Sequence, residues 1–266
     1  LVLAIRHYRR ALDGQRNLAE IHANLGSALR AAGELGEAIE SYGFSLRYKP
    51  DHGTALVNLG NALQEKGDLR AAVWSYRRNL VITPHHAGSY TSIGNTEKEL
   101  AETRRALSSY RRAVVLEPEL PEHRYLAGLV LPKIVASIDD ISEWRDRFNA
   151  GIVELGLLEA PLDEPADHIS TPAFDLAYHD RDDRDLMVAL SELFRAKAPG
   201  LNFNSPHISS WMPPSDGRIK LGICSQYLVT HTIGKLYKGL IEKLDRSKFH
   251  LTLFHTSKSR RDAFSA

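Results

Sequence analysis

The fold is decided by residues 19–52, AEIHANLGSALRAAGELGEAIESYGFSLRYKPDH, because the same pattern returns 34 residues later. Residues 53–86 and 87–120 are the second and third copies, with no insertion between them. All three copies have Leu or Ile then Gly at positions 7 and 8, Ala at position 20, Tyr at position 24 and Pro at position 32. Such a period predicts two antiparallel helices per repeat, which approach closely at the small residues and end at the Pro.

Incomplete copies flank the three full repeats. Residues 1–18 carry part of a repeat in register, and residues 121–131 begin a fourth repeat that Pro132 ends. We therefore expect an α-solenoid of tetratricopeptide repeats over residues 1–131. Each repeat should contact only its neighbours, and the first helices should line a concave groove suited to an extended peptide. The third repeat departs from the pattern at position 11, where Glu97 replaces Leu.

Asparagines recur at two positions that should face this groove. The candidate residues for binding an acceptor peptide are Asn24 and Asn58 at position 6, and Asn61 and Asn95 at position 9. An amide side chain offers a donor and an acceptor to a peptide backbone, which gives affinity without much sequence preference. The alternative is that Asn is simply common in this kind of repeat.

Residues 132–217 read as a helical connector. A capping box at Ser137 and an apolar stripe through Trp144 predict a helix that runs to about Glu159, with Trp144 in the core. Residues 174–179 are expected to be extended, and a further helix should turn three apolar residues inward, Leu186, Leu190 and Phe194. The acidic cluster at residues 180–185 is interpreted as a solvated helix start and not as a metal site.

Residues 218–255 have the pattern of a parallel βαβ unit. A strand over 219–224 is followed by a polar loop, a helix from Thr232 and a second strand from Phe249. Ligands of parallel sheets bind beyond the carboxyl ends of the strands, which makes His231 the candidate catalytic residue. The backbone N–H groups of Thr232, Ile233 and Gly234 could receive a phosphate. Alternatively, His231 only caps the helix.

Composition sets further bounds. The 34 basic and 33 acidic side chains nearly cancel, so we expect no nucleic-acid partner. The single Cys excludes an internal disulfide and a cysteine-based zinc site, and it fits a reducing cytoplasm. No apolar run approaches the roughly twenty residues of a membrane span, and no signal peptide is visible. Both ends of the sequence look cut, so we expect a piece of a longer protein.

The order of these segments resembles the bacterial relatives of O-linked N-acetylglucosamine transferase, the SPINDLY-like group. The resemblance rests on the repeats, on Asp175-Leu176-Ala177-Tyr178-His179, on the strand at 218–225 and on His231 ahead of a helix. It implies that residues 218–266 begin the first Rossmann-like lobe of a GT-B glycosyltransferase. His231 matches the family histidine at the sugar-nucleotide and acceptor site. The sequence departs from the family pattern at Gln226, Tyr227, Thr230 and Thr232.

This resemblance implies a function. The chain would be the amino-terminal portion of a protein glycosyltransferase whose repeats present acceptor polypeptides, inactive without its second lobe. The implied sugar donor is UDP-N-acetylglucosamine, with UDP-glucose and GDP-fucose as alternatives, and neither a metal nor another cofactor is required. The alternative function is a tetratricopeptide adaptor that holds proteins together and carries a non-catalytic α/β lobe.

Overall fold

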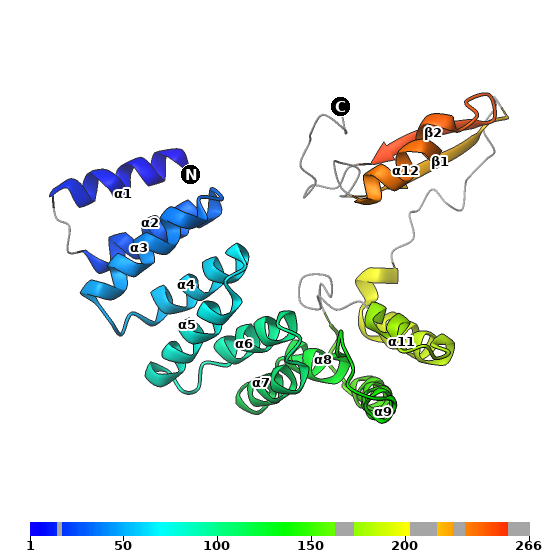
Figure 1. The fold of residues 1–266 in the computed structure, drawn as a ribbon, viewed down its shortest axis with the longest axis horizontal. Helices are drawn as coiled ribbons and strands as arrows, with labels where there is room; N and C mark the ends of the chain where they lie inside the picture. Colours follow the sequence, from blue (N-terminus) through cyan, green and yellow to red (C-terminus); the bar gives the residue numbers. More distant parts are fainter. Residues whose placement is uncertain (15–17, 163–172, 203–216, 226–231, 255–266) are drawn as a thin grey trace. The chain divides into compact units, whose positions relative to one another are not determined.

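The computed structural model describes residues 1–14, 18–162, 173–202, 217–225 and 232–254. The chain forms two compact units, Leu1–Phe203 and Asn204–Ala266. The first unit contains the repeats together with the connector helices, and the second contains the strands (Figure 1). None of the helices in these ranges combines the length and the apolar character that crossing a bilayer requires.

The repeats form antiparallel helix pairs, as predicted. Each helix packs on the one before it and the one after it, and α2 also contacts α4, which in turn contacts α6. The helices of this array are α1 (Val2–Gly14), α2 (Ala19–Ala31), α3 (Leu35–Tyr48), α4 (Gly53–Lys66), α5 (Leu69–Ile82), α6 (Ala87–Glu99), α7 (Thr103–Leu116) and α8 (Pro121–Leu129). The array is therefore a solenoid-like tetratricopeptide fold.

The glycine at position 8 lets the two helices of a repeat touch. A Cβ built on Gly60 would lie 2.4 Å from the ring of Tyr76, and one on Gly94 would lie 2.5 Å from the ring of Tyr110. Both tyrosine rings are buried. Glycine inside a helix costs about 0.5–1 kcal/mol relative to alanine. The close approach of the tyrosine explains why the sequence keeps glycine at this position.

Glu97 occupies the position that Leu29 and Leu63 fill in the other repeats. Only 2% of it is exposed, yet its carboxylate is satisfied. It accepts hydrogen bonds from Ser109 Oγ at 2.9 Å and from Arg77 Nη2 at 3.1 Å. A buried carboxylate needs such partners. The departure from the repeat pattern therefore replaces an apolar contact with a polar link between the second and third repeats.

The connector packs on the end of the array. Helix α9 (Ile138–Gly156) begins at Ser137, whose Oγ accepts a hydrogen bond from Asp140 N at 3.1 Å, as the predicted cap requires. The helix ends at Gly156, three residues before the predicted Glu159. Trp144 is buried as expected, in a core built mainly by α7, α8, α9 and helix α11 (Arg184–Lys197). Leu186, Leu190 and Phe194 of α11 all face this core.

The prediction of an extended segment at residues 174–179 was wrong. Residues Ala173–Tyr178 form the 3₁₀ helix η1, and a second one, η2, spans Pro199–Asn202. No described strand lies beside residues 174–179. Their backbone N–H and C=O groups therefore form local hydrogen bonds, for example from His179 N to Leu176 O at 2.9 Å. This turn buries Leu176 in the core.

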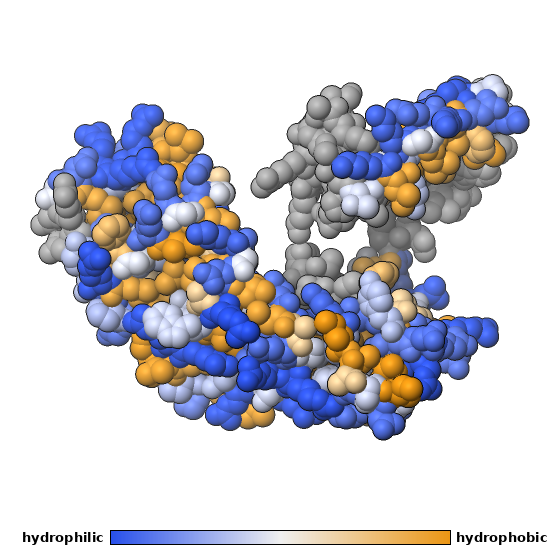
Figure 2. Space-filling model, in the orientation of Figure 1, coloured by the Kyte–Doolittle hydropathy of each residue, from blue (hydrophilic) through white to orange (hydrophobic). Residues whose placement is uncertain are grey.

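The second unit contains the predicted strand–helix–strand order. Strand β1 (Ile219–Cys224) pairs in parallel with β2 (Phe249–Phe254), and Ile219 lies opposite Phe249. Helix α12 (Thr232–Lys243) lies between them in sequence. Several apolar side chains of α12 remain exposed. Leu236 is 71% exposed and Leu240 53%, and orange apolar surface is visible over this helix in Figure 2. Two strands offer too little surface to cover such a helix.

Candidate functional site

The four predicted peptide-binding residues lie on neighbouring first helices, Asn24 on α2, Asn58 and Asn61 on α4, and Asn95 on α6. Two polar residues that were not predicted, Ser27 on α2 and Gln64 on α4, share hydrogen bonds with the same set. We call Ser27, Asn58, Asn61, Gln64 and Asn95 the amide face. Helix α2 contacts α4, and α4 contacts α6, so the three first helices follow one another along the array (Figure 1).

The buried tyrosines at position 24 fix the orientation of the position 9 side chains. The hydroxyl of Tyr76 donates to Asn61 Oδ1 at 2.8 Å, and that of Tyr110 donates to Asn95 Oδ1 at 2.8 Å. Because each amide oxygen accepts from a tyrosine, its NH₂ group is directed the opposite way. The two amides thus present donors, one from each repeat.

The same arrangement begins in the first repeat, where the Tyr42 hydroxyl donates to Ser27 Oγ at 3.2 Å.

Burial raises the pKa of Tyr76 to about 12. Burial also raises the pKa of Tyr110, with the charge of Glu97 acting in the same direction. The hydroxyls therefore remain protonated, and able to donate, at any ordinary pH.

The two asparagines at position 6 have different surroundings. Asn58 is half-buried and its Nδ2 donates to Ser27 Oγ at 3.4 Å, which leaves its carbonyl oxygen as an acceptor. Asn24 is exposed on α2. Of the four predicted residues, Asn58, Asn61 and Asn95 thus belong to the amide face, whereas Asn24 is an exposed residue of α2.

Sequence reasoning missed the tyrosine contacts and Gln64. Gln64 Oε1 lies 3.2 Å from the Tyr76 hydroxyl, a second acceptor for the same donor. A signal was present, because Tyr at position 24 and a polar residue at position 9 recur together in every full repeat. Reading the two positions as a bonded pair would have found the contact.

A pocket of about 470 Å³ adjoins the amide face at Asn95. Its lining includes two basic residues, Lys98 and Lys133, and two acidic residues, Glu99 and Asp175. Phe174 supplies an aromatic surface and is 62% exposed. Burial lowers the pKa of Lys98. The pocket could take a polar side chain of a bound peptide.

The predicted sugar-nucleotide loop falls largely outside the described residues. His231 lies outside them, and so does the side chain of Ile233. Thr232 is exposed at the start of α12, and Gly234, two residues further on, is buried. Across the described ranges, no three His, Cys, Asp or Glu side chains come together as metal ligands would. The residues of this loop remain predictions from sequence.

Comparison with known proteins agrees with the fold of the array. Residues 19–52 match the family described as "Tetratricopeptide repeat". The chain is similar in structure to a mutant of the Thermobaculum terrenum O-GlcNAc transferase, at 18% sequence identity and a TM-score of 0.54. That similarity covers 93% of this chain and 38% of the transferase chain. At this identity the likeness concerns the fold alone.

Two other solved structures have lower TM-scores. The crystal structure of MamA has a TM-score of 0.48 at 20% identity, covering 56% of this chain and 85% of MamA. The tetratricopeptide domain of Arabidopsis OM64 has a TM-score of 0.39 at 20% identity, covering 41% of this chain and 90% of that domain. No curated protein sequence matches the chain.

Proposed function

We propose that the array binds an extended segment of a partner protein along the amide face. The observation that carries this proposal is the row of amides held by buried tyrosines, Asn61 by Tyr76 and Asn95 by Tyr110. Side chains fixed in this way lose little conformational freedom when a ligand binds, so more of the interaction energy appears as affinity.

The chemistry of the amide face suits a polypeptide backbone. An extended peptide offers a carbonyl and an N–H from nearly every residue. The NH₂ groups of Asn61 and Asn95 can donate to peptide carbonyls, and the carbonyl of Asn58 can accept from a peptide N–H. Such contacts read the backbone and not the side chains. Sequence preference would come from the pocket beside Asn95, which offers charges of both signs.

The proposal is tested by replacing Asn24, Asn58 and Asn61 together with alanine. We expect the dissociation constant of a peptide selected on the wild-type protein from a random library to rise about tenfold to a hundredfold, because each lost hydrogen bond is worth about 0.5–1.5 kcal/mol. The fold should survive, since Gln64 offers Tyr76 a second acceptor. The measurement is fluorescence anisotropy with the labelled peptide, alongside a thermal melt.

Asn149→Ala is the matched control, because this residue is exposed on α9 and lies outside the amide face. Its peptide affinity should equal that of the wild type. Equal affinity of the triple variant and the wild type would show that the asparagines only reflect the repeat pattern.

A second proposal is that the array presents such polypeptides to a glycosyltransferase lobe that begins in the second unit. It is supported by the similarity to the transferase over 93% of this chain and by the parallel strand–helix–strand order. The exposed apolar side chains of α12 fit a unit that packs against further structure. In this proposal the loop at 231–234 binds a nucleotide sugar, UDP-N-acetylglucosamine first of all, and His231 acts on the acceptor. If the protein does not transfer sugar, the alternative is that it acts as an adaptor that holds proteins together.

A further inference from the structure

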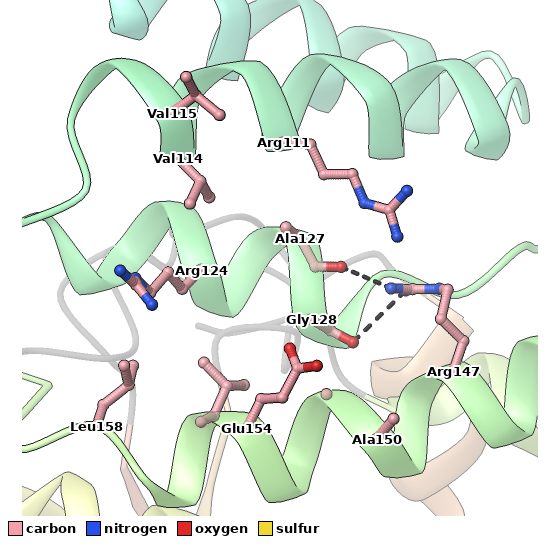
Figure 3. A pocket seen from close by; sticks show the side chains of 12 residues that line it. Arg111, Val114, Val115, Arg124, Ala127, Gly128, Arg147, Ala150, Glu154 and Leu158 are labelled. Carbon is pink, nitrogen blue, oxygen red and sulfur yellow. Dashed lines mark hydrogen bonds between the residues drawn. The ribbon is translucent and has the colours of Figure 1, made fainter.

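A second pocket lies between α7, α8 and α9, lined by different residues from those of the amide face (Figure 3). Its volume of about 430 Å³ is in the range of small-ligand sites. The walls are largely apolar. Val114 and Val115 come from α7 and Ala127 from α8, while Leu155 lies in α9 and Leu158 just after it.

The floor of this pocket is backbone packed on backbone. A Cβ built on Gly151 of α9 would lie 2.4 Å from the carbonyl oxygen of Gly128 in α8. The two helices therefore touch without intervening side chains at this point. In Figure 3, Val114 and Arg111 of α7 face Leu158 and Glu154 across the opening that remains.

Unbalanced positive charge surrounds the cavity. Three arginines line it, Arg111, Arg124 and Arg147, against one acid, Glu154. Six other arginines of the first unit form ion pairs, at positions 9, 30, 77, 104, 105 and 145. Within the described part of the chain, none of the three pocket arginines does so. An apolar cavity lined by three cations and one acid is complementary to an anion that carries an apolar body.

Arg147 is the best fixed of the three. It donates to the carbonyls of Ala127 at 2.8 Å and Val130 at 2.6 Å, where α8 ends, and it stacks on Trp144 with 5.0 Å to the ring centroid. Burial lowers its pKa to about 10, and the nearby charge of Arg111 acts in the same direction. Figure 3 shows these two guanidinium groups on the same side of the pocket. A bound anion would relieve their repulsion.

We propose that this pocket binds a small organic anion, with a carboxylate or phosphate headgroup between Arg111 and Arg147 and an apolar body against Val114 and Leu158. Arg124 adds attraction from the other side of the opening. The site is independent of the peptide-binding proposal, since the two share no residue.

The test is calorimetric titration of the whole chain with four compounds: octanoate, octyl phosphate, 1-octanol and inorganic phosphate. We expect saturable binding of both octyl anions at one site. The neutral alcohol and the bare phosphate should bind at least tenfold more weakly, because the alcohol lacks the charged headgroup and the phosphate lacks the apolar body. A difference between octanoate and octyl phosphate identifies which headgroup the arginines prefer. Equal binding of 1-octanol, or no saturable binding of either octyl anion, would overturn the proposal.

Variants place the site. Arg111→Gln with Arg124→Gln should weaken octyl-anion binding at least tenfold and leave the fold intact, since both side chains are exposed. Ala150→Phe should block binding by filling the cavity that Ala150 lines. Arg112→Gln is the matched control, an exposed arginine next in sequence that does not line the pocket, and it should bind like the wild type. Unchanged affinity of the double variant or of Ala150→Phe would also contradict the proposal.

Discussion

Gly60→Ala is expected to lower the free energy of unfolding by about 1–3 kcal/mol, the usual cost of forcing extra volume into a packed core. The added methyl group would lie 2.4 Å from the ring of Tyr76. That ring is fully buried and its hydroxyl is bonded to Asn61, so it cannot move aside without losing contacts. The measurement is urea denaturation followed by circular dichroism.

Gly43→Ala is the control for this experiment. Gly43 lies in the middle of α3, and a Cβ at that position meets no atom within 4 Å. Alanine should therefore stabilise the protein by about 0.5–1 kcal/mol through helix propensity alone. The two substitutions are chemically identical and should have opposite signs. If both stabilise, position 8 is not a close contact and the packing of the repeats is other than described.

His231→Ala is expected to reduce sugar transfer by about 10²–10⁴-fold, if His231 acts as a general base in the protein that carries both lobes. In the sequence the residue stands between β1 and α12, and ligands of parallel sheets bind beyond the carboxyl ends of the strands. Its removal should leave the apolar core untouched. The assay is transfer of N-acetylglucosamine from UDP-N-acetylglucosamine to a bound peptide, with the melting temperature and peptide affinity measured in parallel.

The outcomes of this substitution separate three roles. A sharp loss of turnover with normal folding supports catalysis, and a raised KM with little change in kcat supports donor binding. A lowered melting temperature would mean that His231 only caps the helix. Unchanged transfer would remove it from the site and leave the glycosyltransferase proposal resting on architecture alone.

The repeat period was sufficient to predict the array, because helix pairs of fixed length leave few ways to pack. The close approach of the two helices at Gly60 and the buried position of Trp144 follow from residue size and register. The parallel pairing of β1 and β2 was likewise readable from the strand–helix–strand pattern. These features are local in sequence or repeat at a fixed distance.

Other features could not be predicted, because they depend on packing between distant elements. The turn of residues 173–178 into a 3₁₀ helix depends on burying Leu176 in a core made by other helices. The arginine pocket needs the faces of α7, α8 and α9 together. The orientation of Asn61 depends on a hydroxyl fifteen residues away. The residue type was enough to make Asn61 a candidate, but the direction in which its NH₂ group donates is known only from its contact with Tyr76.

The central claim is that a partner polypeptide lies on the amide face, and site-directed cross-linking tests it most directly. A photoreactive benzophenone side chain would replace Glu99, an exposed residue that lines the pocket beside Asn95. The control places the same group at Trp74, which is 58% exposed on α5. The account predicts that a library-selected peptide cross-links at position 99, that excess unlabelled peptide suppresses this product, and that position 74 gives none. Cross-linking at position 74 with none at position 99 would contradict it.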